Sequence, residues 1–383
     1  MIRLERIFYP VGHGAFYVER FYMDEEKTPL YTVVFDCGCY NGTPLSTYKG
    51  RINSIIDNDA CLPNTIDVLF ISHFHADHIN GIVHLLALCN VKTIVVPKLS
   101  EIERVELYIQ DLAQADTSDI ESLTSCFESF EDLLSGDNVV TVRVCPESLG
   151  DDWRHNTVNI DNFKGVIDSG TKLQKQFGEM CIWAYTPFNP PINANRASKL
   201  LNTLSQSRVF GPIFSTSVND KYKKLSEMIK NGHLTDLKDV FKKVFNDRHN
   251  EYSMTVLSSC GKCCHQPCEK ACHKSIPSQN RYCTLNCLYM GDFQPDNINL
   301  PLLLKTYDNL KYVGLLQVPH HGSEHNYAKE LYQSPRICIV SADSNDHYSH
   351  PDKKTLDGIV SNKGIVILVT EIESSKQRFI YHL

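Results

Sequence analysis

The sequence lacks an apolar run long enough to cross a membrane. A spanning helix needs about 18–20 consecutive apolar residues, and no stretch of the 383 residues approaches this length. The first residues, Met1–Arg6, are not followed by the apolar segment and cleavage site of a signal peptide. We therefore expect a cytoplasmic protein with no membrane partner.

An excess of positive charge is also lacking, because the formal net charge is −7. This balance argues against a surface that coats nucleic acid along its whole length. The charge is unevenly distributed, however. Residues 101–137 are acidic, and we expect a helical pair at 100–136 on the solvated outside. Residues 216–249 are rich in lysine and have helical apolar spacing, which predicts a helical basic insertion. We expect this insertion to lie near the mouth of the active site that the motifs below indicate.

Four residues organise the chain: His73, His75, Asp77 and His78, in the pattern H-x-H-x-D-H. They follow an apolar run typical of a buried strand and precede a segment with helical spacing. A loop at a strand end can point such side chains at a common centre. Neutral imidazoles with a carboxylate suit zinc, or alternatively manganese or iron. The motif therefore predicts a metal site.

This motif resembles the signature of the metallo-β-lactamase fold superfamily. The resemblance implies an α/β architecture, a four-layer αββα sandwich, with residues 1–383 forming one domain interrupted by insertions. It also implies one or two metal ions in the active site. The ligands that it implies are His73 and His75 for one metal, Asp77 and His78 for the second, and Asp292 as the bridge between them.

Residues 318–323, Val-Pro-His-His-Gly-Ser, resemble the competence-protein (ComEC-type) hydrolase branch of the superfamily. The resemblance implies that one histidine completes the ligands of the second metal. We favour His320 because it comes first after the strand, and His321 would then contact substrate. Ser323 could offer a hydroxyl and an N–H to an anion. His13 stands where the branch has a glutamine, so the role of that glutamine cannot be assigned to His13.

Three further residues are candidates through the same resemblance. Asp36 would orient the metal ligands, although an aspartate beginning a turn is the simpler alternative. His249 is the best-placed candidate for a third ligand of the first metal. His350 could be a ligand, a proton donor to the leaving group or a phosphate contact, with a structural histidine before Pro351 as the alternative.

The 15 cysteines do not suggest a disulfide scaffold, because their number is odd and many crowd into residues 258–287. Their short spacing, with His265 and His273 nearby, is typical of a zinc-knuckle-like structural zinc site. A redox-active thiol cluster and free thiols are the alternatives. We expect this Cys-rich insertion to overhang the active-site face, where it could bind a protein partner. The zinc ligand candidates are Cys260, Cys263, Cys264, Cys268, Cys272, Cys283 and Cys287.

These features predict a metal-dependent hydrolase that uses a metal-activated water. Asp77 and Asp292 would be catalytic through the metals, and His350 through proton transfer. The first choice of substrate is a phosphodiester, including nucleic acid. The reasons are that the ComEC-type branch is linked to nuclease activity, that an aspartate would bridge the two metals, and that the insertions are basic. An ester, thioester or amide hydrolase is the alternative, because one fold serves many chemistries. A second alternative is an interaction module with a vestigial metal site.

Overall fold

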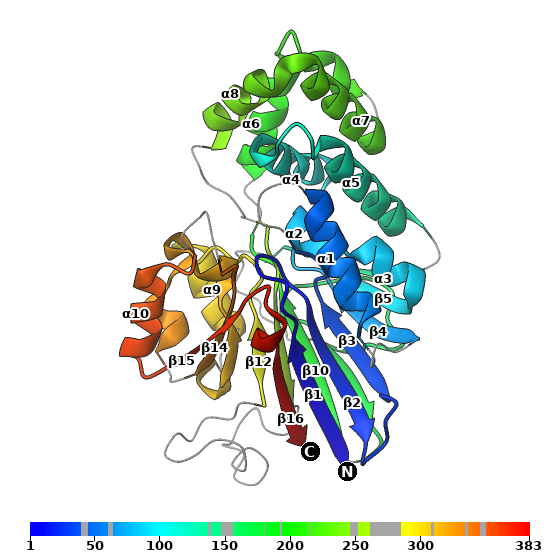
Figure 1. Cartoon of the computed structure of the whole chain (residues 1–383), viewed down its shortest axis with the longest axis vertical. Helices are drawn as coiled ribbons and strands as arrows, with labels where there is room; N and C mark the ends of the chain where they lie inside the picture. Colours follow the sequence, from blue (N-terminus) through cyan, green and yellow to red (C-terminus); the bar gives the residue numbers. More distant parts are fainter. Residues whose placement is uncertain are drawn as a thin grey trace.

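The structure is a computed structural model of the whole chain, and it forms two mixed sheets with helices on their outer faces (Figure 1). Each sheet has 8 strands in the part of the chain that the structure describes. No described helix is both long and apolar enough to cross a membrane. The described residues are 1–39, 45–59, 64–136, 139–146, 156–179, 181–191, 194–215, 217–245, 252–260, 285–307, 310–333, 336–344 and 350–383.

The first sheet has the strand order β16-β1-β2-β3-β4-β5-β6-β8. Strands β1, β2, β3 and β16 pair antiparallel, whereas β3 to β8 pair parallel. The near-continuous apolar runs of β3 and β4 suit strands that are buried on both faces. The bounds are β1 Ile2–Phe8, β2 Tyr17–Met23, β3 Tyr31–Phe35, β4 Thr65–Phe70, β5 Asn90–Pro97, β6 Val140–Val144, β8 Gly165–Ile167 and β16 Gln377–His382.

The second sheet has the order β15-β14-β13-β12-β11-β10-β9-β7. Strands β9 to β12 pair antiparallel, and β12 to β15 pair parallel. The bounds are β7 Thr157–Asn159, β9 Lys172–Phe177, β10 Cys181–Phe188, β11 Thr255–Cys260, β12 Cys287–Tyr289, β13 Leu315–Gln317, β14 Ile337–Ser341 and β15 Ile365–Val369.

Three groups of buried side chains separate four layers. One lies between the sheets and includes Phe35 and Trp183. A second packs the first sheet, for example Leu69, against helices that include α5 with Phe127. The third packs the second sheet against α9, with Leu303, and α10. The helices are α1 Leu45–Asp57, α2 Ala76–Ile79, α3 Ile82–Leu88, α4 Glu101–Gln114, α5 Ile120–Ser135, α6 Ala194–Ser205, α7 Val218–Met228, α8 Leu234–Phe245, α9 Asn299–Thr306 and α10 Lys353–Ser361. The layer order, helices–sheet–sheet–helices, agrees with the expected α/β architecture.

The acidic segment forms α4 and α5, but α4 is not on the solvated outside. Its Glu106 and Gln110 side chains are fully buried, and α6, α7 and α8 pack over it (Figure 1). Lysines of the basic insertion pair with acids of this helical pair. Lys221 pairs with Glu101, and Lys230 Nζ lies 3.3 Å from Glu121 Oε2. The opposite charges that are segregated along the sequence are therefore adjacent in the fold.

The strand ends that flank the Cys-rich segment lie far from the predicted metal site. Cys260 ends β11 and Cys287 begins β12, which then runs toward Asp292. At a strand rise of about 3.3 Å per residue, Cys287 lies roughly 15 Å from that aspartate. The points of attachment therefore do not support the expectation that the segment overhangs the active-site face. Residues 261–284 themselves lie outside the described residues.

Candidate metal centre

The H-x-H-x-D-H motif occupies the expected connection between β4 and a helix. His73 and His75 lie in the loop, whereas Asp77 and His78 lie in the first turn of α2. The three histidines are buried, with exposed fractions of 0 to 6%. Because β3 and β4 run parallel, Asp36 at the end of β3 lies beside this loop.

Asp292 approaches the motif from the second sheet. It follows Gly291, whose φ of +51° is the left-handed conformation that glycine adopts without strain. A Cβ atom at Gly291 would lie 2.5 Å from Ser253 Oγ and 2.6 Å from Ser72 Cβ, so the turn also needs glycine for space. Ser253 Oγ accepts a hydrogen bond from the Asp292 N–H at 2.8 Å. These contacts place the Asp292 carboxylate at the motif.

The third part of the site is the short 3₁₀ segment Pro319–Gly322, after β13. His320 and His321 both have positive φ values, 47° and 54°, which residues with a Cβ adopt only rarely. His321 Nδ1 lies 2.9 Å from the Ser341 carbonyl oxygen, to which it donates, and Nε2 lies 3.3 Å from Asp77 Oδ2. Hence His321 presents Nε2 to the motif.

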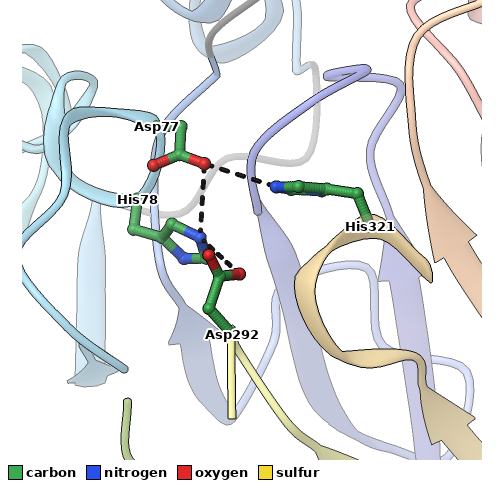
Figure 2. A group of neighbouring side chains, drawn as sticks. All are labelled: Asp77, His78, Asp292 and His321. Atoms are coloured by element: carbon green, nitrogen blue, oxygen red, sulfur yellow. Dashed lines mark hydrogen bonds and ion pairs between the residues drawn. The ribbon is translucent and has the colours of Figure 1, made fainter. Parts of the chain in front are cut away.

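Among the residues that the structure describes, two groups of side chains could each hold a metal ion. Within each group the ligand atoms lie within 4.8 Å of one another. Figure 2 shows one of them, which we call the second group, in which Asp77 and His78 of the motif face Asp292 and His321. Asp292 belongs to both groups, as expected of a bridging carboxylate. The first group is His73, His75 and Asp292. The second group is Asp77, His78, Asp292 and His321.

Asp36 fixes the position of His78. Its Oδ1 accepts from the Ser72 N–H at 2.7 Å, and its Oδ2 accepts from Ser72 Oγ at 2.7 Å and His78 Nδ1 at 2.8 Å. With Nδ1 held, His78 Nε2 points into the centre, 3.3 Å from Asp292 Oδ1. The contact from Asp36 is the carboxylate–histidine arrangement that commonly orients metal ligands.

Surrounding carboxylates favour a charged His78. Burial disfavours the charged ring, but Asp77, Asp36 and Asp292 outweigh burial and raise the pKa of His78 well above its ordinary value. Burial alone would likewise raise the pKa of Asp77, yet the charge of His78 and the hydrogen bond from His321 hold that pKa well below its usual range. Without metal, a proton therefore occupies the position in which His78 would bind a cation.

His73 behaves in the opposite way. Burial and the positive charge of His78 lower the pKa of His73 well below its ordinary value, so this ring is neutral. Its Nδ1 lies 3.0 Å from Ser72 Oγ, and its Nε2 lies 3.0 Å from His75 Nδ1. Two ring nitrogens at this separation need a proton or a cation between their lone pairs.

Sequence reasoning missed a carboxyl group that contacts the motif. Asp111 of α4 accepts a hydrogen bond from the Ala76 N–H at 2.8 Å, and its Oδ1 lies 3.9 Å from His75 Nε2. Burial and the negative charge of Asp77 raise the pKa of Asp111 well above its ordinary value. A cation at the centre would act in the opposite direction and favour the carboxylate. Nothing local distinguishes Asp111 from the other acids of its helix.

The donor set fits a borderline divalent ion such as zinc. Buried carboxylates that converge on one point are costly without a counter-charge. His73, His78 and His321 each use Nδ1 in a hydrogen bond and direct Nε2 to the centre. Imidazole nitrogens and carboxylate oxygens at this spacing are ligands that zinc, manganese and iron accept.

The remaining predicted residues lie around this centre or outside the described residues. His320 Nδ1 lies 2.9 Å from Asn326 Oδ1 and its Nε2 lies 3.9 Å from Asp292 Oδ2, so His321 rather than His320 is in the second group. The His350 ring lies 5.9 Å from the His320 ring. Ser323 Oγ accepts from the His325 N–H at 3.4 Å within its own turn. His249, Cys263, Cys264, Cys268, Cys272 and Cys283 lie outside the described residues.

A family model described as the Metallo-beta-lactamase superfamily matches residues 28–142. The match covers Asp36 and the H-x-H-x-D-H motif and ends before Asp292. No curated protein matches this chain. Residues 28–142 are thus similar to the metallo-beta-lactamase superfamily, and together with the His and Asp groups that could bind metal this similarity suggests a metal-dependent hydrolase.

Proposed function

We propose that the protein is a zinc-dependent hydrolase of phosphodiesters. The observation that supports this most directly is the sharing of buried Asp292 by two potential metal groups. When bound, divalent cations would lower the pKa of a coordinated water and stabilise negative charge on the attacked group. Asp77, His78, Asp292 and His321 would hold one cation, and His73, His75 and Asp292 the other. His321 thereby replaces His320 as the proposed ligand.

Histidine rings beside the second group support an anionic substrate. The His13 ring lies 4.6 Å from the His321 ring and 6.0 Å from the His350 ring. Imidazole N–H groups are hydrogen-bond donors that suit the oxygens of a phosphate. His350 and His320, at the partly exposed edge, are the candidates to donate a proton to the leaving oxygen.

The basic insertion gives less support to a polymeric substrate than its sequence suggested. Lys221 and Lys230 pair with acids of the neighbouring helices, and Lys223 Nζ lies 4.0 Å from Glu128 Oε1. A cation that is already paired releases fewer counterions on binding nucleic acid. We therefore place a small phosphodiester or a nucleotide before a long nucleic acid.

The first experiment is elemental analysis of the purified full chain, with Asp292→Ala and Asp357→Ala variants. Asp357 is an exposed carboxylate of α10 and serves as the matched control. We expect the same metal content in the wild type and in the control, and about one or two equivalents of zinc, manganese or iron fewer in Asp292→Ala. Metal content that does not depend on Asp292 would contradict the proposed site and favour an interaction module.

The second experiment is turnover of bis-p-nitrophenyl phosphate and of p-nitrophenyl acetate by the metal-loaded wild type. Phosphodiester turnover that is lost in Asp292→Ala would support the proposal. Turnover of the acetate alone would refute phosphodiesterase activity and support the ester hydrolase alternative. With single-stranded DNA, a steep fall in activity as salt rises would indicate a polymeric substrate.

A structural zinc in residues 258–287 is a separate proposal, and it would be tested on a variant in which Cys260 and Cys287 are replaced by serine. Both residues are buried in the strands that flank the insertion. Loss of one zinc equivalent without loss of turnover would support a second, independent zinc site. Unchanged zinc content would argue against ligation by these two cysteines.

A further inference from the structure

Helix α4 contacts the loop that carries the first metal group. Asp111 Oδ2 accepts the Ala76 N–H at the start of α2, and Asp111 Oδ1 faces His75 Nε2 at 3.9 Å. The Asp111 side chain is 16% exposed and that of His75 is 8% exposed, so little water competes for this contact. The H-x-H motif thus receives a carboxyl group from a separate helical layer.

The two nitrogens of His75 have different surroundings. Nδ1 faces His73 Nε2 at 3.0 Å, inside the first group, whereas Nε2 faces Asp111. A neutral imidazole carries its proton on one nitrogen and can bind a metal through the other. The negative charge of a carboxylate 3.9 Å from Nε2 favours the tautomer that carries its proton there, and the Nδ1 lone pair of this tautomer points into the metal site.

The same helix also contacts the loop before β11, which in turn holds Asp292. Glu106 Oε2 accepts a hydrogen bond from Tyr252 at 2.7 Å, and Arg196 Nε of α6 lies 2.7 Å from Glu106 Oε1. Tyr252 precedes Ser253, whose hydroxyl oxygen holds the Asp292 backbone N–H. Helix α4 is therefore anchored to both sides of the centre, which keeps Asp111 in place.

We propose that Asp111 is a positioning residue for the first metal group: its carboxylate, which faces His75 Nε2, favours a proton on that nitrogen and so directs Nδ1 toward the cation. This inference rests on the proposed function, because it assumes that the first group binds a metal. Through Asp111, helix α4 of the outer helical layer would contribute to metal binding.

The test is the zinc affinity of the full chain, measured by competition with a chelator. In Asp111→Asn, the amide oxygen can still accept the Ala76 N–H, and this contact turns the amide NH₂ toward His75 Nε2. The variant thus keeps the anchor of α2 but favours the wrong tautomer. We expect the affinity for one zinc equivalent to fall about 10- to 100-fold. Asp116→Asn, the same exchange at an exposed position just after α4, should leave the affinity unchanged.

Zinc affinity is then measured with and without Asp111→Asn in a His75→Ala background. This comparison separates positioning of His75 from a general structural role of Asp111. Without the ring, Asp111→Asn should cause no further loss of zinc affinity at the remaining group. Equal losses in both backgrounds would overturn the proposal, as would an unchanged affinity in Asp111→Asn alone. If Asp111→Asn does not fold, Asp111→Ser provides the same comparison. A wild type that binds no zinc would overturn the proposed function as well, so the two failures are distinguishable.

Discussion

Replacement of Asp36 by asparagine is predicted to weaken metal binding without disturbing the backbone. Asp36 has a φ of +52°, in the left-handed region, which asparagine also tolerates. Its two carboxylate oxygens accept three hydrogen bonds, two from Ser72 and one from His78. An amide has only one oxygen, so its NH₂ group must face at least one of these donors.

The magnitude follows from these contacts. A buried donor that loses its acceptor costs about 1–3 kcal/mol, so the Asp36→Asn variant should be less stable by this amount. A ligand that loses its orienting carboxylate typically costs 10- to 100-fold in metal affinity, equivalent to about 1.4–2.8 kcal/mol. Because His78 belongs to the second group, the loss should affect one equivalent. Chelator competition measures the affinity, and denaturant unfolding measures the stability.

Asp24→Asn is the matched control, because Asp24 also has a positive φ, 45°, but is exposed and pairs with the N-terminal amine. It should leave zinc affinity unchanged. If Asp36→Asn binds zinc as tightly as the wild type, the argument that Asp36 orients His78 is wrong. If both equivalents weaken equally, Asp36 supports the loop in general and not His78 in particular.

Three further predictions concern the same region and the core. Because the pKa of metal-free His78 is raised, zinc must displace its proton, and zinc affinity should fall as pH falls from about 8 to 6; an affinity independent of pH would contradict this. Gly291→Ala should lower the free energy of unfolding by about 1–3 kcal/mol and should also reduce the metal content, because the added Cβ would clash with Ser253 Oγ. Gly178→Ala, with a similar φ of +57° and open space, should lower stability less and leave metal content unchanged. Glu19→Gln should cost about 3–5 kcal/mol in denaturant unfolding, because the buried Glu19 binds the Arg6 guanidinium, and it should leave zinc stoichiometry unchanged.

Much of the first sheet and half of the site could be predicted from local patterns. The apolar run before His73 forms β4, and the apolar spacing after His78 forms the end of α2 and the whole of α3. Both are strong periodic signals over short stretches. The position of Asp292 could be proposed only from the resemblance to a family, and the structure does bring it to both histidine groups.

Other features depend on tertiary packing and have no local signal. Strands β7 and β8 have only 3 residues each and β9 is largely polar, so the sequence of residues 147–178 carries no clear signal for them. The burial of Glu106 follows from its contacts with Tyr252 and Arg196, which are distant in sequence. The choice between two adjacent histidines after β13 depends on the left-handed backbone of both, which no pattern in the sequence reveals.

The two ends of the paired sheets have different roles. The loops that carry Asp36, the histidine motif and Asp292 leave one end, whereas Met1 and Leu383 lie at the other (Figure 1). The Leu383 N–H donates to the Ile2 carbonyl at 2.7 Å, so the first and last residues are neighbours. A short linker could therefore join them in a circular permutant, and an affinity tag or fused domain at either terminus would project away from the metal centre.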